Sequence, residues 1–331
     1  MTMKINYNDW YHSLTVERLK FRNMEISPVG IGTAAWGTGI NGGDQMYGSK
    51  ISENTLTYMF RSAIAQDINL FDTSPAFGTS EETLGYASRF NKNVLFSTKF
   101  LPGIFQRRSA LRKSAENSLA ALGTDSLDFF GLQAPTDIDK WTAEVIPLLD
   151  DGTVKNVGVS NFNISEVKKA QFILEKSGHS LSYVQKHHSI ASHTEKDDEI
   201  LEWCKKNDAL FMAYMVLEQG ALTYKYSNSS MFDSRTIRSD IYNRPVMESL
   251  KPLKSAIHKM AESYSVSDAQ IAIAWSLGRG TLPIIGITKS SHIGGIVSAT
   301  GLIMDEDDIE ILNNTSKSVK VDIKGFWEPE R

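Results

Sequence analysis

The feature that most constrains the fold is a regular alternation of short apolar strand patterns with longer amphipathic helical patterns. Strands that alternate with helices predict a parallel sheet, and eight parallel strands can close into a barrel. We therefore expect an α/β fold, a (β/α)8 TIM barrel, built as a single domain over 1–331, since no low-complexity linker interrupts the alternation. The eight predicted strands are 29–33, 70–72, 94–99, 127–132, 154–160, 183–187, 209–214 and 282–287.

The segments around these strands complete the predicted architecture. Residues 14–26 predict a short N-terminal β-hairpin that turns at Arg22 and Asn23. Two irregular loops, 34–50 and 218–243, are expected to shape the mouth of the barrel. The first 13 residues predict a surface arm, and the tail from 323 predicts either a frayed end or a segment over the mouth. The predicted helices are 52–66, 80–88, 107–122, 140–150, 165–177, 195–207, 246–264, 267–279, 292–299 and 305–316.

Composition excludes several classes of partner. The 331 residues are 41% hydrophobic and carry a formal net charge of −4, without a basic run that would attract nucleic acid or an anionic membrane. No stretch approaches the roughly 18 apolar residues of a membrane span, and the N-terminus lacks a signal-like apolar region. We expect a cytoplasmic protein, a monomer or weak homo-oligomer, that binds a small molecule. The single cysteine, Cys204, reads as a structural helix residue.

A carboxylate stands where the second predicted strand ends. Asp72 closes an apolar run and is followed by a Pro/Gly turn. The next helix is expected to begin at Thr79 and Ser80, with Glu81 and Glu82 completing a capping signature. Because catalytic groups of such barrels come from the carboxyl ends of several strands, Asp72 is a candidate site residue. The alternative interpretation is that it only initiates the turn.

Other polar residues end the neighbouring strands. Lys99 ends the third strand, Gln133 follows the fourth, and Ser160 and Asn161 end the fifth. A lysine beside an aspartate in a cleft is a recognisable way to hold a charged pair and to tune both groups. A salt bridge at the mouth with no catalytic role is the alternative.

Several motifs together resemble the aldo-keto reductase family, and the segment 152–162, ending in Val-Gly-Val-Ser-Asn-Phe, is the most specific of them. The resemblance implies a (β/α)8 barrel that binds NAD(P)H across its mouth and transfers a hydride to a carbonyl. The other matching segments are 30–33, 72–73, Gly78 with 80–81, Lys99, Gln185, 213–214 and 283–286.

The resemblance assigns expected cofactor contacts. Ser160, Asn161 and Gln185 would hold the nicotinamide carboxamide, and Tyr214 would stack on the ring. Lys289, Ser290 and Ser291 could meet a 2′-phosphate, and NADP(H) is the expected cofactor, with NAD(H) as the alternative. At the adenosine end, Gly295 and Ile296 replace the usual Glu and Asn. Leu217, Gly286 and His292, which replaces a basic residue, complete the expected cofactor set.

Two of the four positions that form the family's catalytic tetrad differ here. Asp72 and Lys99 match, but Phe77 stands at the tyrosine position and Gln133 at the histidine position. A positioned proton donor contributes roughly 10²- to 10⁴-fold, and Phe77 cannot act as one, whereas Gln133 can still donate a hydrogen bond. Ordinary ketone reduction should be slow.

Three accounts of this difference stay open. Another group could supply the proton, with Lys99, Tyr47, His187 and His188 as candidates, although loop histidines are more often polar surface residues. The substrate could instead need no strong acid, as with an iminium ion or an activated enone. Redox chemistry could also be lost.

We therefore expect an atypical NAD(P)H-dependent oxidoreductase that acts on a carbonyl, imine or activated alkene. The alternative is a redox-inactive or non-redox relative, either a binding or regulatory protein or a cyclase or dehydratase. No metal site is predicted, because His187 and His188 are adjacent and would point apart in a strand.

Overall fold

The computed structural model describes residues 18–39, 41–48, 50–91, 93–103, 105–226, 232–319, 321 and 323. The predicted surface arm at 1–13, the tail after 323 and part of the predicted loop 218–243 lie outside these residues.

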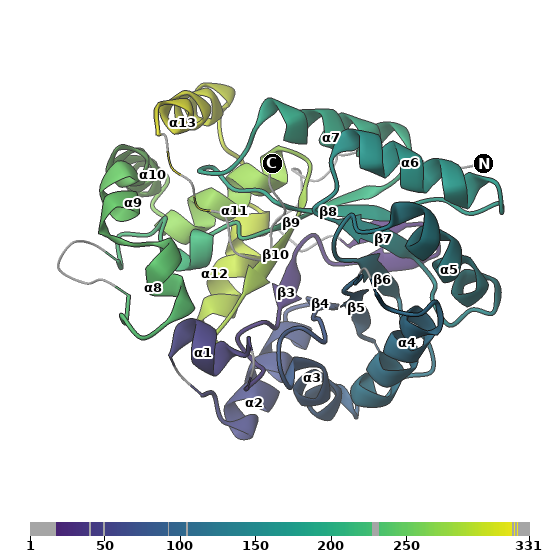
Figure 1. Ribbon diagram of the computed structural model, residues 1–331. Coiled ribbons are helices and arrows are strands. Elements are labelled where there is room, and N and C mark those ends of the chain that lie inside the picture. Colours follow the sequence, from purple (N-terminus) through teal and green to yellow (C-terminus); the bar gives the residue numbers. More distant parts are fainter. Residues whose placement is uncertain are drawn as a thin grey trace.

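Eight parallel strands form a closed barrel, which confirms the predicted (β/α)8 fold (Figure 1). The barrel closes where the last strand pairs with the first, with Ile284 opposite Gly30. In the order in which they neighbour one another, the strands are β10 (Leu282–Gly286), β3 (Gly30–Gly32), β4 (Leu70–Asp72), β5 (Leu95–Phe100), β6 (Phe129–Leu132), β7 (Val157–Ser160), β8 (Tyr183–His187) and β9 (Leu210–Tyr214).

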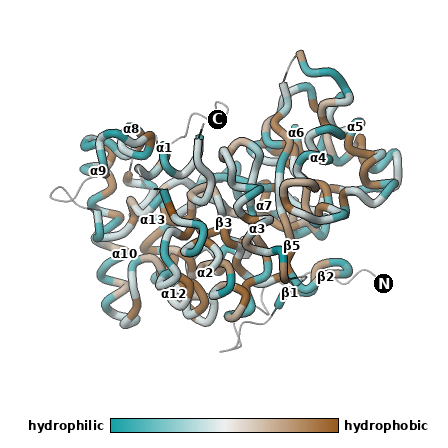
Figure 2. Tube along the Cα trace, turned by 90° about the horizontal axis from the view of Figure 1, so that it is seen from below, coloured by the Kyte–Doolittle hydropathy of each residue, from teal (hydrophilic) through white to brown (hydrophobic). Residues whose placement is uncertain are grey.

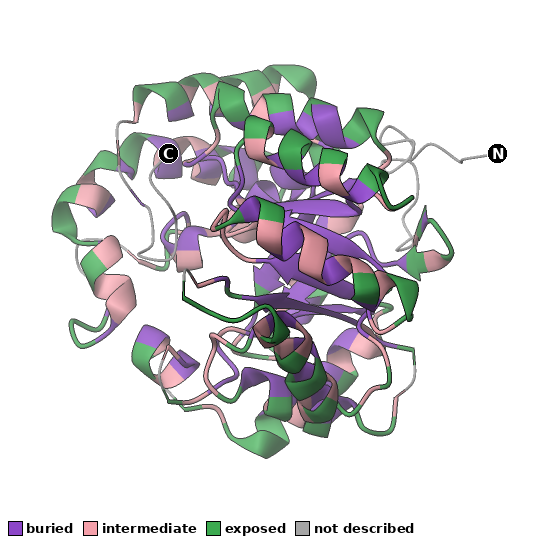
Figure 3. Cartoon of the chain, turned by 45° about the vertical axis from the view of Figure 1, so that its right-hand side comes forward, coloured by how far each residue is buried: buried purple, intermediate pink, exposed green. Residues whose placement is uncertain are grey.

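Helices surround the barrel, with their buried faces toward the strands and their exposed faces outward (Figure 3). Helix α2 (Glu53–Ile64) illustrates the pattern, since its buried residues recur three and four positions apart: Leu56, Met59, Phe60 and Ala63. The others are α1 (Gly43–Tyr47), α3 (Ser80–Ser88), α4 (Ser109–Leu122), α5 (Ile138–Asp150), α6 (Ile164–Glu175), α7 (Glu195–Lys206), the 3₁₀ turn η2 (Glu218–Gly220), α8 (Ile237–Ile241), α9 (Arg244–Ser249), α10 (Lys251–Ser263), α11 (Asp268–Gly278), α12 (Ser291–Thr300) and α13 (Glu306–Ser318). None of the helices in the described part is long and apolar enough to cross a membrane.

The predicted N-terminal hairpin is present and closes one end of the barrel. Strands β1 (Leu19–Phe21) and β2 (Met24–Ile26) pair antiparallel. Phe21 and Ile26 are fully buried in a cluster with inward-facing strand residues such as Phe129, whose ring centroid lies 6.3 Å from that of Phe21. Figure 2 shows the hairpin at the end of the barrel opposite α1 and α8. Only the other end is therefore available as a mouth.

Three details differ from the sequence predictions. The expected long helix 246–264 is two helices, α9 and α10, because Pro252 near the start of α10 has no N–H to donate to the preceding turn. The loop 34–50 contains α1, and the loop 218–243 contains η2 and α8, so neither is wholly irregular. Thr79 does not cap α3 through its side chain; its hydroxyl instead pairs with Thr38 of the first loop.

A large side chain fills the middle of the barrel. Tyr183 of β8 is fully buried, and a glycine on each of the two preceding strands, β7 and β6, leaves space for it. A Cβ atom at Gly158 would lie 2.3 Å from ring carbons of Tyr183, and one at Gly131 would lie 2.6 Å from its hydroxyl oxygen. Because side chains alternate along a strand, the next inward residue of β8 toward the mouth is Gln185.

We predict that Gly158→Ala destabilises the fold by about 1–3 kcal/mol, because the added methyl overpacks against the Tyr183 ring. Urea unfolding monitored by circular dichroism measures the effect. Gly294→Ala is the matched control, because nothing lies within 4 Å of a Cβ atom at that position and alanine favours a helix. Equal midpoints for wild type and Gly158→Ala would contradict the packing described here.

Candidate functional site

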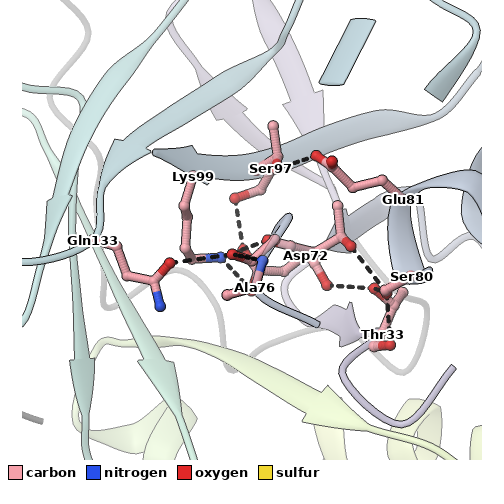
Figure 4. Close-up of polar contacts among 11 residues, drawn as sticks. Thr33, Asp72, Ala76, Ser80, Glu81, Ser97, Lys99 and Gln133 are labelled. Atoms are coloured by element: carbon pink, nitrogen blue, oxygen red, sulfur yellow. Dashed lines mark hydrogen bonds and ion pairs between the residues drawn. The ribbon is translucent and has the colours of Figure 1, made fainter. Parts of the chain in front are cut away.

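The structure brings Asp72 and Lys99 together at the mouth. Strands β4 and β5 are paired neighbours, and both side chains face inward. The Lys99 Nζ atom lies 2.7 Å from Asp72 Oδ1 and 2.8 Å from Oδ2, and the two side chains are only 5% and 8% exposed. Figure 4 shows this pair at the centre of a network of polar contacts.

The other partners of this pair use up its hydrogen-bonding capacity. Lys99 Nζ also donates to the carbonyl oxygen of Thr73 at 3.0 Å, so its three N–H groups all have acceptors. The Ser97 hydroxyl donates to Asp72 Oδ1 at 2.6 Å. A buried charge is stable only when paired and fully hydrogen-bonded in this way. Lys99 therefore has no spare proton to donate to a substrate without breaking one of these bonds.

Tyr183 lies beneath the pair. Burial, together with the negative charge of Asp72, raises the pKa of its phenol. Since the ring is completely buried in the barrel, this hydroxyl stays protonated and cannot touch a ligand at the mouth. It supports the floor of the site.

Phe77 is half-buried in the turn between β4 and α3. Its N–H donates to the carbonyl oxygen of Ser74 at 3.0 Å. The first loop packs closely on this turn, since a Cβ atom at Gly37 would lie 1.8 Å from the Phe77 carbonyl oxygen and one at Gly78 would lie 2.1 Å from that of Thr38. Gly78 also has φ of +61°, which favours glycine. These contacts hold the turn, and with it Phe77, in a defined position. The Phe77 side chain is an apolar ring without a proton to donate.

Gln133 directly follows β6 and is fixed by three contacts. Its N–H donates to the carbonyl oxygen of Phe100 at 2.9 Å, and its own carbonyl oxygen accepts from Asn161 Nδ2 at 3.2 Å. In the side chain, Oε1 accepts from the Ser74 hydroxyl at 3.1 Å. Gln133 thus links the turn after β4 to the end of β7.

The residues expected to hold a nicotinamide lie together on three adjacent strands. Ser160 pairs in register with Gln185, and Asn161 and Tyr214 follow or end their strands nearby. Tyr214 donates through its hydroxyl to Asn161 Oδ1 at 2.8 Å. The Gln185 side-chain nitrogen is buried and has no hydrogen-bond acceptor among the described residues, so it is a donor in need of a partner.

The residues expected to meet the rest of the cofactor follow β9 and β10. Leu217 is half-buried just before η2, and Gly286, at the end of β10, is exposed with open space around its Cα. Lys289 is exposed at the start of α12, beside Ser290. Partial desolvation and the positive charges of Lys225 and Lys289 lower the pKa of His292. His292 is therefore uncharged at neutral pH, and the positive charge here comes from the two lysines.

The structure separates the four suggested proton donors. Lys99 is fully engaged, as described above. Tyr47 is half-buried in α1, and burial raises the pKa of its phenol although Arg238 acts in the opposite direction, so it is a weaker acid than a free tyrosine. His187 and His188 are each only 1% exposed, so the interpretation of them as surface residues is wrong.

The two histidines have different structural partners. The ring of His188 stacks on Trp275, with centroids 5.3 Å apart. His187 instead lies 5.6 Å from the Tyr214 ring, and its Nε2 is 2.8 Å from Glu218 Oε1. They point apart, as expected for neighbours at the end of a strand. Neither reaches the solvent at the mouth.

Glu218 is the centre of a buried network that the sequence analysis missed. Its carboxylate is fully buried and accepts from His187 and from the hydroxyls of Ser189 and Tyr242. It lies in a turn where Met215, Glu218 and Gln219 all have positive φ, a conformation that costs about 1–2 kcal/mol for each non-glycine residue. The network fixes this strained turn, which begins directly after Tyr214.

Ser74, Ser97 and Tyr183 were also missed. Ser97 could have been found, because it lies two residues before Lys99 on the same inward face of β5. Tyr183 offered a weaker signal, an aromatic residue two positions before Gln185. Nothing in the sequence indicated that Ser74 would reach Gln133, because a turn carries no side-chain periodicity.

We predict that Lys99→Met destabilises the protein by about 3–5 kcal/mol, because it leaves the Asp72 carboxylate buried without its cation. The double variant Asp72→Asn/Lys99→Met should recover part of the loss, since it removes both charges. Urea unfolding of wild type, both single variants and the double variant measures the coupling. Additive single effects would show that the pair does not act as a unit.

Known proteins resemble this chain over most of its length. A pyridoxal reductase of the chloroplast from Arabidopsis thaliana is 27% identical over 315 residues, covering 88% of this chain and 84% of that protein. The aldo-keto reductase YhdN from Bacillus subtilis is 27% identical, with 88% of this chain and 90% of that protein covered.

Solved structures share the fold. A glycerol dehydrogenase from Gluconobacter oxydans superposes with a TM-score of 0.77 at 21% identity, over 95% of this chain and 100% of that one. An aldo/keto reductase from Klebsiella pneumoniae, solved with NADP and acetate, gives 0.66 at 22% identity, over 93% of this chain and 94% of that one. The model of the aldo/keto reductase family matches residues 28–317. This chain therefore belongs to the aldo/keto reductase family.

Proposed function

We propose that this protein is an atypical NADP(H)-dependent oxidoreductase that transfers a hydride between nicotinamide and a carbonyl, imine or activated alkene of a small molecule. Its active site combines the buried Asp72–Lys99 pair with Gln133 as a hydrogen-bond donor and Phe77 as an apolar wall. Phe77 and Gln133 take the places that a tyrosine and a histidine occupy in the family. Family membership supports the oxidoreductase class, and the substrate class follows from these two residues.

The observation that carries the proposal is the unpartnered amide nitrogen of Gln185. A buried donor without an acceptor costs about 1–3 kcal/mol, so this position is expected to have a ligand. A carboxamide oxygen of nicotinamide would satisfy it. Tyr214, held by Asn161, offers an aromatic face beside it. These features fit a nicotinamide better than an apolar ligand.

When bound, the nicotinamide supplies or accepts a hydride. The residues of this chain orient it and stabilise the product. For carbonyl reduction, hydride adds to the carbon, the π electrons move to the oxygen, and Gln133 donates a hydrogen bond to that oxygen through Nε2. The proton comes from water, because Phe77 has none and the N–H groups of Lys99 already have acceptors.

The lack of a positioned proton donor in the site limits which substrates can react quickly. Without a positioned proton donor, reduction of an unactivated ketone loses roughly 10²- to 10⁴-fold. An iminium ion accepts hydride and becomes a neutral amine without needing a proton. An activated enone spreads the negative charge onto a distant oxygen. Both suit this site better than a simple ketone, and the activated enone also offers the Gln133 amide an oxygen to bind.

The preference for the phosphorylated cofactor would come from two lysines. Lys289 and Lys225 both lower the pKa of His292 through their positive charges, and a 2′-phosphate in this region would meet the same positive field. His292 is neutral at pH 7, so it can donate a hydrogen bond to a phosphate oxygen but brings no charge. Family structures that contain NADP or NADPH support this choice.

A binding experiment tests the cofactor assignment. We expect Gln185→Leu to weaken the binding of NADPH and NADH alike, by about two- to tenfold, because each lost hydrogen bond costs about 0.5–1.5 kcal/mol. Lys289→Met should weaken NADPH binding selectively. Fluorescence titration measures both, with the exposed Lys113→Met on α4 as the control. If wild type does not bind NADPH at millimolar concentration, the proposed function is wrong.

Single-turnover kinetics test the chemistry. We expect wild type to reduce a cyclic iminium ion faster than an aldehyde or ketone of similar size. The double variant Phe77→Tyr/Gln133→His should gain roughly 10²- to 10⁴-fold toward the ketone, because it restores a proton donor. Stopped-flow absorbance of NADPH follows the reaction. A wild type that reduces ketones as fast as this double variant would contradict the role given to Phe77.

The second candidate is a protein of this fold that binds a ligand or catalyses a non-redox step. The hydrogen bonds of Lys99 favour this candidate. All three of its N–H groups already have acceptors within the protein, so Lys99 offers no proton to a substrate. Cofactor binding without hydride transfer to any of the three substrate classes would select this candidate.

A further inference from the structure

We propose that Ser74 is a positioning residue that fixes the Gln133 amide with its oxygen turned inward and its nitrogen turned toward the ligand. This inference rests on the proposed function, in which Gln133 donates to the substrate oxygen. Ser74 itself touches neither substrate nor cofactor. It determines which end of a nearly symmetric amide the reacting atoms meet.

The hydrogen bonds of Ser74 determine which end of the Gln133 amide faces Ser74. Its side-chain oxygen accepts from the N–H of Ala76 at 3.2 Å and lies 3.1 Å from Gln133 Oε1. Ser74 is fully buried, so its own proton needs an acceptor. Gln133 Oε1 is the acceptor in reach. If the amide were reversed, its NH₂ would face an oxygen that already accepts from Ala76, and the hydroxyl proton would lose its acceptor.

The backbone of Gln133 leaves little freedom for a different arrangement. Its N–H is bound to Phe100 and its carbonyl oxygen to Asn161, so the residue is held from both neighbouring strands. In Figure 4 the amide oxygen of Gln133 points toward the Asp72–Lys99 pair and the amide nitrogen points away from it. Among the described residues, no acceptor is bonded to that nitrogen. The side-chain torsions remain free, and the hydrogen bond from Ser74 is the contact that opposes their rotation.

This arrangement makes the site insensitive to pH in the neutral range. A serine hydroxyl and a glutamine amide do not titrate there, so the hydrogen bond to the substrate oxygen persists unchanged. A reversed amide would present Oε1 to the oxygen on which negative charge develops, which is repulsive. Orientation of the amide therefore decides whether Gln133 assists or opposes hydride transfer to a carbonyl.

A double-mutant cycle at Ser74 and Gln133 tests the proposal by kinetics. We expect Gln133→Leu to lower the single-turnover rate with an activated enone by roughly 10²-fold, the usual effect of removing an oxyanion donor. Ser74→Ala should lower it by about tenfold, equivalent to one hydrogen bond, with NADPH affinity unchanged. In the Gln133→Leu background, Ser74→Ala should have no further effect. Ser74→Thr, which keeps the hydroxyl, should restore the rate.

A binding measurement without turnover tests the role of Ser74 independently of the proposed oxidoreductase activity. In protein with ¹⁵N-labelled glutamine, the Gln133 side-chain NH₂ signals are identified by their loss in Gln133→Leu. Acetate, whose oxygens can only accept, should shift these signals in wild type, and Ser74→Ala should weaken the apparent acetate affinity several-fold. If wild type transfers no hydride, the proposed function fails, and the acetate titration still decides the role of Ser74.

Three outcomes would overturn the inference. One is an acetate titration in which the Gln133 signals do not move. Another is an acetate affinity that is equal in wild type and Ser74→Ala. The third is a Ser74→Ala effect on the rate that is the same with and without Gln133, because a general structural role for Ser74 would act in both backgrounds.

Discussion

Closure of the parallel barrel is the constraint on which the rest of this structure depends. Eight strands enclose a narrow interior, and every second residue of each strand must fit inside it. Phe21 and Ile26 of the hairpin fill one end, and Tyr183 fills the middle because Gly131 and Gly158 have no side chains. The remaining inward positions lie at the mouth. Polar residues can occupy them only as mutual partners, and Asp72 and Lys99 meet this condition.

Much of the fold could be predicted from the sequence because its signals are periodic. β4, α3 and β8 begin and end where the sequence patterns predict. Asp72 and Lys99 could be placed together because they end adjacent parallel strands. Predictions were wrong where one residue changes the local backbone, as Pro252 does between α9 and α10, or where tertiary contacts replace a local cap, as at Thr79.

The candidate site was less predictable, because several of its contacts join loops. Ser74 reaches Gln133 across two turns, and Glu218 reaches His187 from the loop after the next strand. Neither contact has a spacing that a sequence pattern can reveal. What the residue types do indicate is the electrostatic character of the mouth. The buried Asp72–Lys99 pair is internally neutralised, and the groups beside it, Gln133 and Phe77, carry no charge.

The Glu218 network also has a consequence for motion. Bonds to His187, Ser189 and Tyr242 tie the turn after β9 both to β8 and to the segment before α9. Opening this turn would break the hydrogen bonds that three donors now make to the Glu218 carboxylate. The turn is therefore expected to be rigid and not to act as a hinge. The first loop packs beside this part of the chain, since α1 contacts α8. It is held by the Trp36 indole N–H, which donates to the carbonyl oxygen of Ile287 at 3.1 Å, and by the Tyr47 ring, which lies against Arg238. The rim of the mouth on this side is therefore held at several points, and opening it would disrupt a buried network rather than a single contact.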